Sequence, residues 1–521
     1  MSTKARWIFY ASLIVIALSF RLFIALRLPN DEPDDGRVYS QIARNMLEQH
    51  VYSIESQAPY TPTLIRLPGY PLFVAAIYSI FGHGNNTAVR VAQAVLDTIT
   101  CALIAWVAFE WSRKRWAAMI ALALAAVCPF TAIYVATILT EVPTNFLAVA
   151  MVLTATFAFK ATVRKRAITW WIVTGLIAGV AVFFRPDSGL FAAAIGLTLM
   201  LSSLRKFREA TLQAAIFSIA FCLVLVPWTI RNHRLFHVFQ PLSPAHAEMP
   251  GEFVPRGYLL WVRTWLDDQR YVSPALWAMD TRQIHVEDFP ARAFDSKEER
   301  DRVAALFEKY NHPDGDEADE QQSADDQSDD SSGDEEEEPE EEPEPEEHPE
   351  PADANVEMTP DIDAGFAQIG QERVGRSPLR YYVVLPLKRA MTLWFDTHSQ
   401  YYPFNGELLP LEDLDHDIHQ QYWLPLFAGL TGIYTLLGVI GGWLLWRRNE
   451  RRWLLLAALM IFLRLGFFAT LENPEPRYTV ELFPFLILVA AAGLAIYSGV
   501  GDATGCSDGG ITAGFGVSVD E

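Results

Sequence analysis

Long apolar stretches follow one another along most of the chain, with short polar turns between them. A stretch of about 20 residues is long enough to cross a hydrocarbon core roughly 30 Å thick. Such stretches recur through the first 230 residues and again after residue 420. The pattern predicts an all-α polytopic membrane protein with about ten transmembrane helices, at 7–27, 88–110, 116–136, 143–160, 168–184, 187–203, 211–230, 421–446, 453–470 and 478–498.

The first stretch is predicted to be a retained membrane anchor. It is longer than the apolar core of a signal peptide, and no small-residue cleavage site precedes Asn30. Basic residues collect at one end of the stretches when these are threaded alternately through a bilayer, which marks that end as cytoplasmic. The basic groups are Lys4 and Arg6, residues 113–115, Lys160 with residues 164–166, Arg205, Lys206 and Arg208, and Arg447, Arg448, Arg451 and Arg452. We therefore expect a multi-pass protein of the plasma (inner) membrane with both termini in the cytoplasm.

The segment 68–82 is apolar but would be only about 22 Å long as a helix, which is short for a crossing. Counting it as a span would move every later basic group to the opposite face. We therefore expect an amphipathic or re-entrant element in the outer interface. A second juxtamembrane helix is predicted from Arg37 to Gln49, because its apolar residues recur on one face.

This threading divides the chain into four parts. Residues 1–230 form a transmembrane catalytic module whose first outer loop is 28–87, residues 231–420 face outward, and 421–498 complete the membrane helices. Residues 499–521 are predicted to be a flexible cytoplasmic tail. Within the outward segment a helix is expected near 292–309, and apolar character returns near Leu379.

Composition changes this picture in one respect. The chain is 51% hydrophobic and yet carries a net charge of -22. Residues 314–363 contain 25 Asp or Glu and no Lys or Arg, and without them 41 basic residues face 38 acidic ones, a net charge of +3. Such a tract cannot bury enough apolar surface to offset chain entropy, so we expect a disordered insert. Two interpretations remain open for it: a tolerated loop insertion, or a segment that binds cations or repels anionic polymers.

The same numbers exclude two classes of protein. A sequence pI near 4.9 argues against nucleic-acid binding, which needs a basic face. Four cysteines in 521 residues do not make a disulfide framework.

Candidate chemistry begins directly after the first stretch, in the segment 30–36 (NDEPDDG). Its carboxylates lie at the predicted outer surface, where one could act as a general base or a metal ligand. Asp34 or Asp35 could equally cap the helix that begins near Arg37. Both interpretations stay open on the segment alone.

Arginines at other predicted helix mouths favour the catalytic interpretation. Four of them arrive at the outer face together with Glu141: Arg66, Arg185, Arg231 and Arg477. Guanidiniums converging with carboxylates would bind a phosphate diester or pyrophosphate beside a general base. The alternative is that each arginine extends to the lipid headgroups.

Asp35, Arg66, Arg231 and Arg477 lie in motifs that resemble the bacterial family 39 glycosyltransferases of the GT-C superfamily, which includes protein O-mannosyltransferases and lipid A aminoarabinose transferases. The motifs are Asp35-Gly-Arg-Val-Tyr39, Ala43-Arg-Asn-Met-Leu47, Arg66-Leu-Pro-Gly-Tyr-Pro71, Pro227-Trp-Thr-Ile-Arg-Asn232 and Pro476-Arg-Tyr478. The resemblance covers residues 1–240 and 420–498.

The resemblance implies an enzyme that transfers a sugar from a polyprenyl-phosphate donor, with inversion, to a lipid, glycan or protein acceptor at the outer face. It implies that Asp35 is the general base and that Glu141 helps to position a substrate. Gly36 departs from the family pattern, which often has Glu there, so Asp31, Glu32 and Asp34 remain alternatives as the base. Tyr39, Tyr70 and Tyr478 belong to the motifs and are predicted to position substrate.

Other charged residues give weaker indications. His416 and His419, within an acidic stretch, could bind a divalent cation or belong to a solvated loop; no cofactor is otherwise predicted. Arg21, Asp97 and Arg464 lie within spans, where a charge pairs with another residue or lines a path to the donor site. The alternative function is a transporter or lipid flippase, although no internal duplication is visible.

Overall fold

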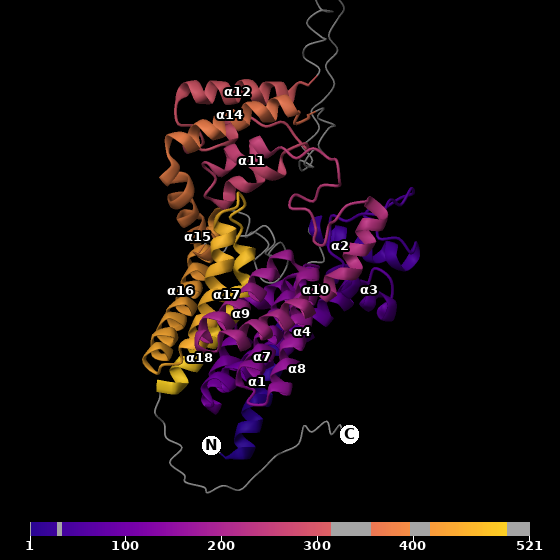
Figure 1. Cartoon of the computed structure of the whole chain (residues 1–521). Helices are drawn as coiled ribbons and strands as arrows, with labels where there is room; N and C mark the ends of the chain where they lie inside the picture. The colour runs from indigo at the N-terminus through magenta and orange to yellow at the C-terminus, as the bar shows by residue number, and fades with distance from the viewer. Residues whose placement is uncertain (1, 29–33, 314–355, 396–416, 498–521) are drawn as a thin grey trace, which may run out of the picture.

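The computed structural model of the chain describes residues 2–28, 34–313, 356–395 and 417–497. Every regular element in these ranges is a helix (Figure 1). Eight segments are long and apolar enough to cross a membrane. They are α1 (Thr3–Arg27), α4 (Asn86–Ser112), α7 (Glu141–Lys160), α8 (Arg164–Phe184), α10 (Phe207–Phe236), α16 (Asp417–Arg447), α17 (Arg451–Ala469) and the pair η9 (Pro476–Leu482) and α18 (Phe483–Tyr497).

A ninth candidate crossing is broken in the middle. Helix α5 (Arg115–Ala126) is followed by α6 (Pro129–Ala132) and η1 (Ile133–Ala136), with a bend of 54°. Arg21 donates to the carbonyls of Ala125 and Ala126, each at 3.0 Å, and its Nε lies 2.6 Å from Asp97. Arg21 and Asp97 therefore form an interhelical pair that satisfies the carbonyls freed at the break.

The tenth predicted span is α9 (Gly189–Ser202), which has 14 residues and is therefore only about 21 Å long. It lies between the short helices η2 (Pro186–Ser188) and η3 (Leu204–Lys206). All ten predicted stretches are thus helical, and the predicted all-α polytopic fold is confirmed. The two expected juxtamembrane helices are also present, as α2 (Asp34–Glu48) and α3 (Gly69–Phe81), which pack on each other.

The membrane helices share one apolar core, in which α18 contacts α4, α5 and α16. Helices α16 and α18 approach so closely that a Cβ on Gly493 would lie 2.2 Å from the carbonyl oxygen of Gly441. Only glycine fits at this crossing, as is common where membrane helices pack through their backbones.

A second helical body, which we call the cap, comprises residues 256–313 and 356–376 and stands at one end of the membrane helices (Figure 1). Its own core is rich in aromatic side chains, among them Trp261, Trp265, Phe307 and Phe366. Its elements are α11 (Arg256–Arg263), η4 (Gln269–Tyr271), η5 (Ser273–Trp277), η6 (Val286–Asp288), η7 (Ala291–Ala293), α12 (Lys297–Asn311) and α14 (Pro360–Arg376). Two further helices, η8 (Arg380–Val384) and α15 (Leu385–Phe395), return the chain to the membrane helices.

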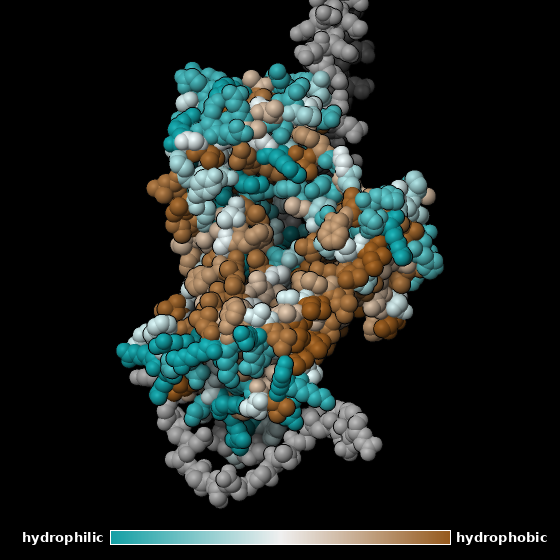
Figure 2. All heavy atoms as spheres, in the orientation of Figure 1, coloured by the Kyte–Doolittle hydropathy of each residue, from teal (hydrophilic) through white to brown (hydrophobic). Residues whose placement is uncertain are grey.

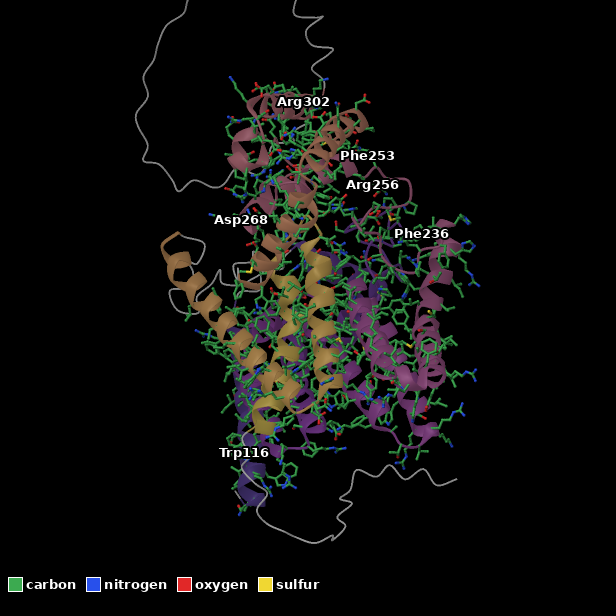
Figure 3. All side chains as sticks on the ribbon, turned by 60° about the vertical axis from the view of Figure 1, so that its left-hand side comes forward. Trp116, Phe236, Phe253, Arg256, Asp268 and Arg302 are labelled. Atoms are coloured by element: carbon green, nitrogen blue, oxygen red, sulfur yellow. The ribbon has the colours of Figure 1, made fainter. Side chains whose placement is uncertain are left out.

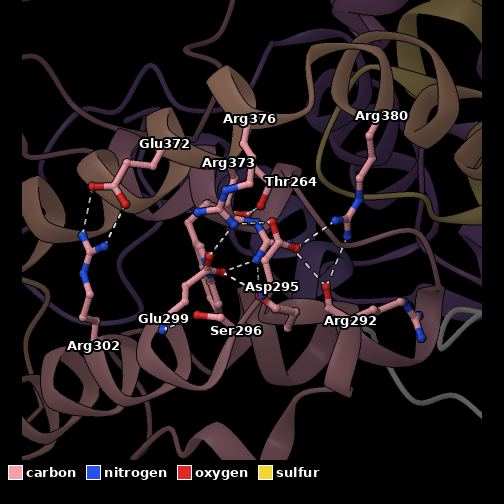
Figure 4. Close-up of polar contacts among 12 residues, drawn as sticks. Thr264, Arg292, Asp295, Ser296, Glu299, Arg302, Glu372, Arg373, Arg376 and Arg380 are labelled. Carbon is pink, nitrogen blue, oxygen red and sulfur yellow. Dashed lines mark hydrogen bonds and ion pairs between the residues drawn. The ribbon is translucent and has the colours of Figure 1, made fainter.

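Ion pairs bind the helices of the cap together (Figure 4). Buried Arg373 of α14 pairs with Glu299 of α12, and its second nitrogen lies 3.2 Å from Asp295. Met358 packs in the aromatic core, and α14 begins at Pro360. The end of the predicted acidic insert, up to residue 363, therefore belongs to the folded cap, while residues 314–355 lie outside the described ranges.

The predicted basic groups lie at the end of the molecule opposite the cap. We call this the basic end and the other the cap end. Lys160 of α7 pairs with Glu110 of α4 at the basic end, and Trp111 stacks on Trp453 at 5.5 Å. Figure 2 shows hydrophilic surface at both ends and a hydrophobic band between them. Figure 3 shows Trp116 at the basic end and Asp268 and Arg302 in the cap.

Candidate active site

The predicted base, Asp35, lies in the first turn of α2, where the backbone favours a carboxylate. Its two oxygens contact two arginines that come from distant parts of the sequence. Arg66, in the loop before α3, lies 2.8 Å from Oδ1, and Arg477, at the start of η9, lies 3.0 Å from Oδ2. The Asp35 side chain keeps 23% of its surface exposed, so the bridged carboxylate remains accessible.

A second pair lies beside the first. Glu141 begins α7, and Arg185 ends α8 with an extended backbone (φ −146°). Their side chains meet at 2.8 Å, and Arg477 links them to Asp35 because its Nε lies 4.0 Å from Glu141. Glu141 is buried, and its Oε2 has no hydrogen-bond partner among the described residues.

Three further charged residues extend the network. Arg464 of α17 contacts Asp187 at 2.5 Å and Glu481 at 3.0 Å. Arg185 shares both carboxylates, at 3.2 Å and 3.4 Å respectively. Arg464 also donates to the carbonyl of Tyr478 at 3.0 Å, which anchors η9.

Within the described residues the network alternates arginines with carboxylates. Its arginines are Arg66, Arg185, Arg464 and Arg477, and its acids are Asp35, Glu141, Asp187, Glu475 and Glu481. Nearly all of these side chains are buried or largely buried, and a buried charge is stable only when it is paired. The residues at the cap-end margin, Asp35 and Arg66, are the most exposed. The network therefore has a buried part, in which the charges are paired, and an accessible rim formed by Asp35 and Arg66.

Sequence reasoning missed Asp187, Glu475 and Glu481. Arg-Pro-Asp at 185–187 and Glu-Pro-Arg at 475–477 place an acid next to an arginine already singled out, and that spacing was an available indication. Arg464 was predicted only to pair with another residue within the membrane or to line a path to the donor site. The structure gives it two acidic partners, Asp187 and Glu481.

The tyrosines frame the network in two ways. Tyr39 and Tyr70 meet edge to face, with ring centroids 5.0 Å apart, and the Tyr70 hydroxyl donates to Gln93 at 2.7 Å. Tyr478 lies against the guanidiniums of Arg185 and Arg477, at 5.5 Å and 5.4 Å. Burial raises the pKa of Tyr39 to about 12, so this phenol stays protonated at neutral pH.

The charge state of Asp35 follows from its partners. Burial raises the pKa of its carboxyl, but the guanidiniums of Arg477 and Arg66 lower it by more, so the pKa lies below its ordinary value. Asp35 is therefore ionised at neutral pH.

One predicted site residue, Arg231, lies outside the network. Arg231 lies over the ring of Trp228 at 4.6 Å. It also donates at 2.7 Å to the carbonyl of Thr63, which is on the loop that carries Arg66. The side chain of Asp34 lies outside what the structure describes, as do Asp31 and Glu32. The same holds for the predicted cation ligands His416 and His419, and no group of three metal-binding side chains occurs in the described part of the chain.

The surface is hollowed below the cap. Figure 2 shows a hollow between the cap and the side of the molecule that carries α2 and α3. Asp35 lies on α2 and faces arginines from the α2–α3 loop and from η9. Asp35 and Arg66 are the network residues that a ligand can reach from solvent, because they keep 23% and 26% of their side-chain surface exposed.

Comparison with known proteins gives one family match. Residues 62–230 match the family model described as dolichyl-phosphate-mannose-protein mannosyltransferase. This segment includes Arg66, Glu141 and Arg185 and ends just before Arg231. No curated protein sequence matches the chain.

Two kinds of solved structure are similar to the chain. One is the oligosaccharyltransferase AglB of Archaeoglobus fulgidus in complex with an inhibitory peptide and a dolichol-phosphate, with 12% identity, a TM-score of 0.48, and coverage of 95% of this chain and 51% of that one. The other is ArnT of Cupriavidus metallidurans bound to undecaprenyl phosphate, with 14% identity, a TM-score of 0.38, and coverage of 95% and 78%.

The chain thus spans about half the length of the archaeal enzyme. TM-scores below 0.5 are too low for either structure to guide the assignment of residues. The family match does not depend on them, and it falls on the segment that carries four of the predicted site residues, Arg66, Tyr70, Glu141 and Arg185. It confirms, over residues 62–230, the resemblance to GT-C glycosyltransferases that the sequence motifs indicated.

Proposed function

We propose that this protein is an inverting membrane glycosyltransferase. It takes a sugar from a polyprenyl-phosphate-linked donor and transfers it to a lipid, glycan or protein acceptor at the outer face of the plasma membrane. The observation that carries the proposal is the Asp35 carboxylate held between Arg66 and Arg477. The family match over residues 62–230 supports the reaction class.

The arginine pair supports a site for a phosphate group. Two guanidiniums that grip one carboxylate from both sides are placed to grip a phosphate in the same way, because both anions accept paired N–H donors. Arg185 lies one ion pair further in, through Glu141. A donor phosphate at the rim would therefore compete with Asp35 for Arg66 and Arg477.

That competition would make Asp35 a better base. Its pKa is low while both guanidiniums face it, and it rises when they turn to the phosphate. Asp35 would then take the proton of the acceptor hydroxyl as the acceptor oxygen attacks the anomeric carbon. The bond from that carbon to the phosphate oxygen breaks, and the departing phosphate keeps the electron pair, stabilised by the arginines.

Glu141 is suited to hold a substrate hydroxyl. Arg185 fixes one of its oxygens at 2.8 Å, and the other has no hydrogen-bond partner among the described residues. A buried carboxylate oxygen in that state gains from a hydroxyl donor. The positive-inside distribution of the basic residues supports an outer-face position for this site.

The variant Asp35→Asn tests the proposal. We expect it to insert into the membrane normally and to lose sugar transfer from labelled polyprenyl-phosphate sugars to an envelope extract, because an amide cannot accept the proton. The matched control is Glu48→Gln on the same helix, since Glu48 lies at the exposed end of α2 and, among the described residues, pairs with His83.

Full transfer by Asp35→Asn would refute the assignment of the base. Movement of the labelled lipid across vesicles without a new glycosidic bond, in the unaltered protein, would instead favour a transporter.

A further inference from the structure

Helices η8 and α15 carry an exposed apolar face outside the predicted spans. We call Leu379, Tyr382, Val383, Leu387 and Met391 the α15 stripe. Their spacing of three, one, four and four residues places them on one side of a helix. They are 69%, 67%, 44%, 63% and 60% exposed, and none of the described residues covers them. Figure 2 shows hydrophobic surface at the edge of the molecule where Figure 1 places α15.

The charged residues of the same helices turn toward the cap. Arg380 lies 2.9 Å from Asp295, and Lys388 lies 3.3 Å from Asp267. Buried Arg389 donates to the carbonyls of Leu266 and Arg263. A helix on a water-exposed surface has the opposite arrangement, with its apolar face inward and its charges outward.

The lower end of α15 already lies among the membrane helices. Trp394 donates to Thr435 at 2.8 Å, within the apolar window of α16, and the carbonyl of Leu393 accepts from Thr479 at 2.9 Å. Leu393 also packs on Phe468 at the cap end of α17. The stripe is therefore continuous with surface that faces lipid. Its last residue, Met391, precedes Trp394 by about one turn of helix.

We propose that the α15 stripe lies in the bilayer leaflet at the cap end and contacts lipid acyl chains and the inner part of the headgroup layer. The outward segment 231–420 then re-enters the membrane near Leu379 and not at residue 421. The cap is held at the surface by this helix, with its ionic side facing the cap and its apolar side facing lipid. This inference rests on the membrane topology and is independent of the proposed reaction.

Spin labels in the full-length protein in lipid vesicles test the proposal. The four native cysteines are first replaced by alanine, and one cysteine is introduced per variant. Leu387→Cys and Met391→Cys probe the stripe, and Lys388→Cys is the matched control, one residue away and turned toward Asp267. Leu223→Cys on the exposed face of α10 gives the lipid reference, and Glu372→Cys on the cap gives the water reference.

Labels at 387 and 391 should collide with oxygen, which partitions into lipid, several times more often than with a water-soluble nickel complex. The label at 391 should show the larger ratio because it is closer to the membrane helices. The labels at 388 and 372 should show the reverse preference.

Free access of the nickel complex to 387 and 391, equal to that at 372, would overturn the proposal. Protection of both labels from both reagents, with spin–spin broadening, would overturn it in favour of a second copy of the chain. Protection without broadening would overturn it in favour of another protein.

Discussion

At the scale of single residues, the site depends on arginines that each serve more than one acid. Arg477 contacts Asp35 and Glu475 and approaches Glu141, while Arg185 contacts three carboxylates. Such sharing suits arginine, whose planar fork presents five donors. Loss of one arginine would leave several buried carboxylates short of a partner at once.

The low pKa of Asp35 leads to a pH prediction. A carboxyl whose pKa is depressed remains ionised as the pH falls, until the pH reaches that lowered value. We expect the acid limb of kcat/KM, which reports the free enzyme, to lie below about 3.9, the ordinary pKa of Asp.

Removing one of the cations should move that limb. In Arg66→Gln the pKa of Asp35 rises, because one of its two guanidiniums is gone, and the acid limb should shift to higher pH. The limb of Glu48→Gln should stay in place, since Glu48 is remote from Asp35. An unchanged limb in Arg66→Gln would show that a group other than Asp35 titrates.

How much of the site the sequence predicts is decided by the kind of residue. Asp35, Arg66, Glu141, Arg185 and Arg477 were singled out because carboxylates and arginines occur together at the predicted outer helix mouths, and the structure brings them together. Glu481 was missed because it lies at the start of an apolar stretch, where nothing in its neighbours indicates that Arg464 is opposite. Contacts between distant segments are set by packing, which hydropathy does not describe.

At the scale of elements, the ten apolar stretches were predicted from length and composition alone, because a bilayer imposes both. The break between α5 and α6 was not predicted, although Pro129 marks it. The break is stabilised by Arg21 and Asp97 from two other helices, and such help from neighbours is invisible in a local pattern.

The crossing of α16 and α18 gives a prediction at this scale. Gly493→Ala places a methyl group where the backbone of Gly441 already lies, so the two helices must separate. We expect a loss of about 1–3 kcal/mol, as for other overpacked cores, seen as a lower midpoint of thermal unfolding in detergent.

Gly466→Ala in α17 is the matched control for that variant. Nothing lies within 4 Å of the position that its Cβ would take. Its unfolding midpoint should stay the same or rise slightly, because alanine favours a helix over glycine. A midpoint that falls equally in both variants would show that close approach is not the cause.

At the scale of the whole molecule, the cap is closed without the acidic tract. Asp280 accepts from the backbone of Met358 at 3.0 Å, and its own N–H donates to the Tyr310 hydroxyl at 2.7 Å. The chain therefore leaves the cap after α12 and returns to it close to the same point. The residues between contribute most of the excess negative charge.

Replacing residues 316–353 by a short Gly/Ser linker tests the tolerated-insertion interpretation. We expect the shortened protein to keep its unfolding midpoint and at least half of its transfer activity, because the cap contacts lie on either side of the cut. Loss of transfer with an unchanged midpoint would instead indicate that the acidic tract takes part in function.

The bridge between Asp35 and Arg477 also has a consequence for biosynthesis. The two residues are 442 positions apart, and Arg477 arrives with η9 and α18, the helices nearest the C-terminus among the described residues. During translation Asp35 and Glu141 enter the membrane long before Arg464 and Arg477 leave the ribosome. The ionic network can therefore close only after the final helices are inserted, and a prematurely terminated chain would expose uncompensated charge that quality-control proteases could detect.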